Sequence, residues 1–153
     1  MHRITIIALL AVLPLTACAS GPGSGPGPDE VVVIGEDPRL LVHDFSSAME
    51  ALLTGELEYL ADERCLVLAM RDEATGEVVG RSEIVWPAGV EALGDGRTGV
   101  TVPGLGDLVP GDSFSAGGGP APGEGWAAVA NAPDSCAPDG GGFAVLTRDT
   151  FTR

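Results

Sequence analysis

From Gly55 onward the chain consists of short apolar stretches, each ended by glycine, proline or aspartate. With 23 glycines and 12 prolines, few of the intervals between these residues are long enough for a helix. In several stretches the apolar side chains recur at every second position, which is the period of a strand with one buried face. The spacing therefore predicts a mainly β fold, a small OB-like barrel or sandwich of about five strands with one short helix.

The expected strands follow from this period of two. They cover residues 31–34, 55–61, 64–70, 77–86, 90–93, 99–102, 112–116 and 143–147.

One segment has the pattern of a helix. In residues 46–54, Ser47 and Glu50 fit a capping box, apolar residues fall on one face, and Gly55 suits the end of a helix. The glycine-rich residues 117–125 predict a loop.

The N-terminus has the pattern of an export sequence. Arg3 precedes the apolar run 4–15, which is too short to cross a bilayer. The run ends in Leu15-Thr16-Ala17-Cys18, which resembles the lipobox of bacterial lipoproteins. That resemblance implies a signal peptide over residues 1–17 and acylation of Cys18, so that the partner of this end is the lipid bilayer. The alternative is an ordinary signal peptide cut after an Ala-x-Ala-like site.

The remaining chain divides into two parts. Residues 18–30 would form the lipidated N-terminus and a flexible Gly/Pro/Ser tether, and residues 31–153 a single small β domain. Two or more acyl chains on Cys18 would give stable anchoring without a membrane-spanning segment. We expect the protein at the extracytoplasmic face of the cell membrane.

The chain has three cysteines. If Cys18 carries lipid, Cys65 and Cys136 remain as an even pair in an oxidising compartment, which predicts a disulfide. The alternative is two unrelated buried thiols. The cysteine spacing matches no metal-binding motif, so we expect no metal site and no cofactor.

The chain is strongly acidic, with 22 Asp and Glu against 8 Lys and Arg and a formal charge of −14. Such a surface repels phosphate groups, which excludes nucleic acid as a partner.

Gly111-Asp112-Ser113 resembles the nucleophile block of GDSL-type esterases and lipases. A serine nucleophile needs a base, but His2 belongs to the predicted signal peptide and His43 precedes the serine, whereas the base of that family follows it. We therefore interpret Ser113 as a strand residue on the face opposite Phe114.

Two pairs of acidic residues resemble binding or catalytic sites, but neither has the required pattern. Asp134 and Asp139 do not have the spacing of a calcium loop. Glu56 and Glu58 fall on one strand face and are interpreted as solvent contacts rather than a catalytic pair.

The two tryptophans differ in context. Trp86, between Val85 and Pro87, is expected in the core or at a barrel end. Trp126 lies in a Gly/Pro-rich stretch and is the candidate ligand contact, because aromatic rings stack on sugars.

The chain also resembles short uncharacterised lipoproteins of high-GC Gram-positive bacteria, a resemblance that supports the fold and supplies no chemistry. The residues that carry it are Gly55, Leu57, Cys65, Leu66, Val85, Trp86, Pro87, Gly111, Asp112, Gly117, Gly118, Gly119 and Cys136. The sequence predicts a non-enzymatic binding or envelope-assembly module for an unknown envelope protein or glycan. The alternatives are a glycan-binding module that uses Trp126 and a serine esterase that uses Ser113.

Overall fold

The computed structural model describes residues 30–45, 51–120, 136 and 142–153. The predictions for the N-terminus, including acylation of Cys18, lie outside these residues, as do those for Trp126, Asp134 and Asp139. No helix in the described part of the chain is long and apolar enough to cross a membrane.

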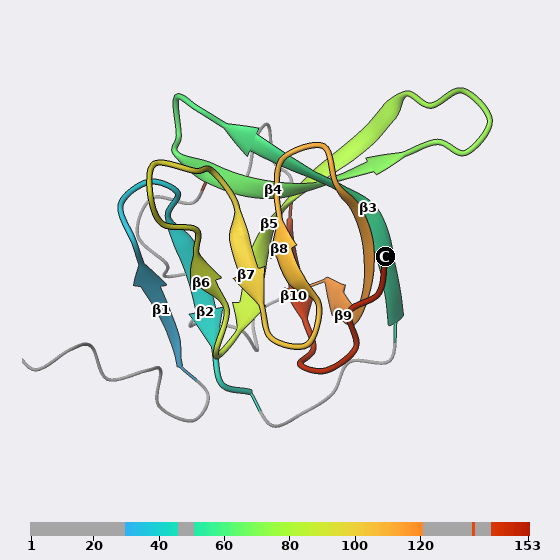
Figure 1. The fold of residues 1–153 in the computed structure, drawn as a ribbon. Coiled ribbons are helices and arrows are strands. Elements are labelled where there is room, and N and C mark those ends of the chain that lie inside the picture. Colours follow the sequence, from blue (N-terminus) through green and yellow to red (C-terminus); the bar gives the residue numbers. More distant parts are fainter. Residues whose placement is uncertain (1–29, 46–50, 121–135, 137–141) are drawn as a thin grey trace, which may run out of the picture.

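The described residues form strands and turns (Figure 1). In chain order the strands are β1 Val31–Ile34, β2 Leu40–His43, β3 Ala51–Leu60, β4 Cys65–Arg71, β5 Val78–Pro87, β6 Glu91–Ala92, β7 Val100–Val102, β8 Gly106–Leu108, β9 Ser113–Pro120 and β10 Phe143–Leu146.

Five of these strands close into a barrel in the order β3-β4-β5-β10-β9 and back to β3. β5 and β10 run parallel, whereas the other neighbouring pairs are antiparallel. Numbered along the chain, the barrel strands therefore follow the order first, second, third, fifth, fourth. A small closed barrel of five strands is the OB-like architecture that the sequence predicts, and the predicted fold class is confirmed.

β3 closes the barrel because it changes partner along its length. Its first part pairs with β9, up to Glu56 opposite Ser113, and its last part pairs with β4, from Glu56 to Leu60. Gly55 stands at this change of partner, where an added Cβ would lie 2.6 Å from the carbonyl oxygen of Ala69. The close approach of β4 requires glycine here.

The connection between β5 and β9 forms a separate three-stranded sheet, β6-β7-β8. Figure 1 shows this sheet in front of the barrel strands, and its residues Val100 and Leu108 are fully buried in the same core cluster as the barrel interior. In that core Trp86 stacks on Phe114, with ring centroids 6.3 Å apart, as expected for a core tryptophan. The small sheet therefore closes the apolar interior of the barrel.

β1 and β2 extend the barrel wall at β5. β2 runs parallel to the last part of β5, and β1 pairs antiparallel with β2. The outer face at this point is apolar, because Leu41, Val85 and Val145 form a second buried cluster there.

Two secondary-structure predictions are wrong. Residues 51–54 of the expected helix belong to β3, while residues 46–50 lie outside the described part. Residues 117–120 of the expected loop belong to β9. Both errors have one cause: β9 pairs with β3 on one side and with β10 on the other, and these ladders determine the conformation of both segments.

Candidate functional site

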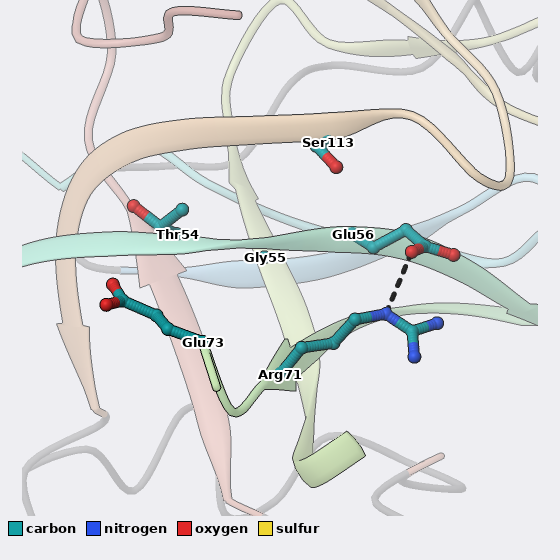
Figure 2. Close-up of a pocket in the computed structure, with 6 residues that line it drawn as sticks. All are labelled: Thr54, Gly55, Glu56, Arg71, Glu73 and Ser113. Carbon is teal, nitrogen blue, oxygen red and sulfur yellow. Dashed lines mark hydrogen bonds and ion pairs between the residues drawn. The ribbon is translucent and has the colours of Figure 1, made fainter. Parts of the chain in front are cut away.

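A polar pocket of about 240 Å³ lies where β3 changes partner. Figure 2 shows Arg71 and Glu73 on one side of β3 and Ser113 on the other. The lining residues are Thr54, Gly55, Glu56, Arg71, Glu73 and Ser113.

The backbone and an ion pair fix the charged side of this pocket. Arg71, the last residue of β4, donates from Nε to Glu56 Oε2 at 2.9 Å (Figure 2). The same guanidinium donates from Nη1 to the carbonyl oxygen of Gly76 at 3.1 Å. The arginine thereby joins β3 to the turn between β4 and β5.

Asp72 fixes the shape of that turn. Its Oδ1 accepts hydrogen bonds from the backbone N–H groups of Thr75 and Ala74 and from the Thr75 hydroxyl. These hydrogen bonds hold the pKa of the exposed Asp72 carboxyl below its usual range, and the bond from the Thr75 N–H has the largest effect. An ordered turn places Glu73 beside the pocket.

The other side of the pocket carries hydroxyl groups. Ser113 is exposed at the start of β9, and its neighbour Phe114 is buried in the core, so the predicted alternation of the two faces is confirmed. Nearby, the Thr54 and Ser115 hydroxyl oxygens are 2.8 Å apart.

The pocket lining contains no histidine. His43 is buried, and the backbone engages both of its ring nitrogens: Nε2 lies 2.8 Å from the Leu146 carbonyl oxygen, and Nδ1 accepts from the Phe45 N–H at 3.0 Å. Burial, the largest cause, lowers the pKa of His43. Both ring nitrogens of His43 are therefore occupied by hydrogen bonds to the backbone, and His43 is not positioned as a base for Ser113.

The two β3 carboxylates that the sequence places on one face each pair with an arginine. Glu56 pairs with Arg71, and Glu58 accepts two bonds from Arg81, at 2.7 and 3.1 Å. Their side chains remain about a third exposed. Both are surface ion pairs: Glu56–Arg71 joins the neighbouring strands β3 and β4, whereas Glu58–Arg81 joins β3 to β5 across β4.

A second polar cluster lies at the start of β4, on the outside of the barrel. Cys65 and Cys136 form the predicted disulfide, which is confirmed, with Cα atoms 6.2 Å apart. Arg39 Nη2 lies 3.0 Å from Cys136 Sγ and 3.4 Å from Cys65 Sγ. The buried Glu83 accepts a hydrogen bond from the Cys136 N–H at 2.8 Å.

Sequence reasoning missed Arg71 and Glu73 at the pocket and Arg39 and Glu83 at the disulfide. Arg71 and Glu73 lie between the predicted strands 64–70 and 77–86, so their exposure was foreseeable. Glu83 is a single acid within an apolar strand, and a buried charged residue needs partners. The position of Glu83 in this strand was therefore the sequence signal that could have indicated the second cluster.

Comparisons with models of protein families, with curated proteins and with solved structures give no match to this chain.

Proposed function

We propose that this chain is a lipid-anchored, extracytoplasmic binding module, without enzymatic activity, whose ligand is an uncharged or amino-bearing glycan of the cell envelope. The observation that carries the ligand class is the polar pocket at the change of partner of β3. The lipobox-like residues that end at Cys18 carry the anchoring.

The fold and the charge of the chain together limit the possible classes of ligand. OB-like barrels bind oligonucleotides and oligosaccharides. A formal charge of −14 opposes a polyphosphate ligand, so the saccharide is favoured.

The pocket lining offers hydrogen-bond donors and acceptors for the hydroxyl groups of a sugar. The Thr54 and Ser113 hydroxyls both donate and accept, the Glu73 carboxylate accepts, and the Arg71 guanidinium donates. The lining holds two carboxylates and one guanidinium, and this excess of negative charge favours neutral or amino sugars over acidic ones.

Trp126 is a further proposed contact, by stacking on a sugar ring. It follows β9 in the sequence, outside the described residues. Trp126→Ala therefore belongs in the same binding measurement.

Ligand binding is tested by isothermal titration with soluble fragments of the cell wall. Arg71→Ala and Glu73→Gln each remove one polar partner and are expected to weaken binding about tenfold, the equivalent of about 1.4 kcal/mol. The matched control is Arg97→Ala, because Arg97 is also an exposed arginine in an ion pair, with Asp107 at 3.0 Å. Equal affinity of all three variants and the original chain would place the ligand elsewhere.

Anchoring is tested by Cys18→Ser with metabolic lipid labelling. The variant is expected to lose the label and to accumulate uncleaved or to be released from membranes. Mature variant protein in the membrane fraction would contradict the assignment.

A further inference from the structure

A second cluster of potential ligand atoms surrounds the disulfide. A sulfur from each of Cys65 and Cys136 and a carboxylate oxygen of Glu83 all lie within 4.8 Å of one another. The exposed fractions of these residues are 1%, 3% and 5%. Nothing in the proposed glycan-binding function uses them.

We propose that the reduced form of this cluster is a site for a soft divalent metal ion, Zn²⁺ or Cd²⁺, with Cys65 Sγ, Cys136 Sγ and Glu83 as ligands. Metal and disulfide are alternative occupants of the same two sulfurs. This inference is independent of the glycan proposal.

The ligand types support the assignment. Thiolate sulfur and carboxylate oxygen are established ligands of zinc, at about 2.3 Å and about 2.0–2.2 Å. Two sulfurs on one tetrahedral ion are then about 3.8 Å apart, against about 2 Å in a disulfide. Rotation of the two cysteine side chains supplies this separation, because their Cα atoms are 6.2 Å apart.

The charge balance supports a divalent ion. Two thiolates and the Glu83 carboxylate carry three negative charges, and the adjacent Arg39 guanidinium carries one positive charge. Because uncompensated charge is costly in a buried position, a divalent cation suits this ligand set better than a monovalent one. Arg39 would then donate to the metal-bound sulfurs from outside, as groups around metal sites commonly do.

Exchange of the disulfide for a bound metal ion requires a reductant. A dithiol reductant transfers two electrons and two protons to the Cys65–Cys136 bond and becomes a disulfide itself. The two thiols then lose their protons to solvent as both sulfurs bind the metal.

The test is a Cd²⁺ titration of the full chain, reduced and freed of reductant without oxygen, followed by the ultraviolet thiolate-to-metal charge-transfer band and by native mass spectrometry. We expect one ion per reduced chain and none held by the oxidised chain. Glu83→Gln keeps an acceptor for the Cys136 N–H and is expected to weaken binding about tenfold or more. Glu77→Gln, an exposed acid in the β4–β5 turn, is the control and is expected to bind as the original chain does.

Two outcomes would overturn the proposal: a reduced chain that binds no more Cd²⁺ than the oxidised one, or unchanged affinity in Glu83→Gln. If reduction unfolds the chain, far-ultraviolet circular dichroism replaces affinity as the readout. One equivalent of Zn²⁺ is then expected to restore β structure in the original chain but not in a chain with both cysteines replaced by serine. Failure of Zn²⁺ to restore it would equally refute the site.

Discussion

His43 Nε2 donates a hydrogen bond to the carbonyl oxygen of Leu146 at 2.8 Å and thereby joins the ends of β2 and β10 across β5. The donor is fixed by the other nitrogen, since Nδ1 accepts from the Phe45 N–H and so carries no proton. A protonated imidazole would place two N–H groups against each other at Nδ1. The contact therefore requires the neutral ring.

We expect the stability of the protein to fall as His43 titrates. Burial, the largest cause, lowers the folded-state pKa below the ordinary value of 6.5, against opposing effects of Leu146 and Asp44. Between these two pKa values the unfolded chain binds more protons, so this contribution to stability is complete above about pH 6.5 and is lost as the pH falls toward the folded-state pKa. Urea denaturation at pH 7.5, 6.5 and 5.5 measures the change.

The matched variant is His43→Gln, which can donate to Leu146 but does not titrate. Its free energy of unfolding is expected to change less over the same pH range. An equal pH dependence in both chains would show that other groups cause it.

Ser113→Ala is expected to change the free energy of unfolding by no more than about 0.5 kcal/mol, because the side chain is exposed. Phe114→Ala, the adjacent residue on the buried face, is expected to cost about 3–5 kcal/mol. Thermal denaturation of both variants compares the two faces of β9. An ester hydrolysis assay on Ser113→Ala addresses catalysis, and turnover that depends on the serine would disprove our interpretation.

Gly55→Ala is expected to destabilise the barrel by about 1–3 kcal/mol, because the new Cβ would lie 2.6 Å from the Ala69 carbonyl oxygen and 2.8 Å from Leu68 Cδ1. Gly94→Ala is the control, since no atom lies within 4 Å of a Cβ there. Denaturation midpoints that are equal for the two variants would contradict the packing argument.

The same packing explains what the sequence could and could not predict. The strands around Leu68 and Ile84 were predictable, because their apolar runs are bounded by turn residues. The glycine-rich end of β9 has no such pattern. There, Gly118 is needed because an added Cβ would lie 2.3 Å from the Val145 carbonyl oxygen. A run of glycines that close packing between strands requires therefore has the same sequence pattern as a loop.

The helix pattern before Gly55 failed for a related reason. Leu52 and Leu53 fit a helical face, but their backbone pairs with Gly117 and Ala116 of β9, more than sixty positions away. Local preference is weak beside such a ladder. The pocket was unpredictable for the same reason, since Thr54 and Ser113 meet only once the barrel closes.

Replacing both Cys65 and Cys136 by alanine is expected to lower the free energy of unfolding by about 2–5 kcal/mol. The disulfide closes a span of 71 residues, for which the loss of chain entropy in the unfolded state corresponds to roughly 4 kcal/mol. The disulfide also holds Cys136 in the position where its backbone N–H donates to the buried Glu83 carboxylate. Without the disulfide, this donor is less firmly held against the carboxylate. Guanidinium denaturation of oxidised, reduced and doubly substituted chains measures the effect, and non-reducing peptide mapping reports the bond itself. Equal stability of the three forms, or free thiols at both positions in protein never exposed to reductant, would contradict the role of this bond.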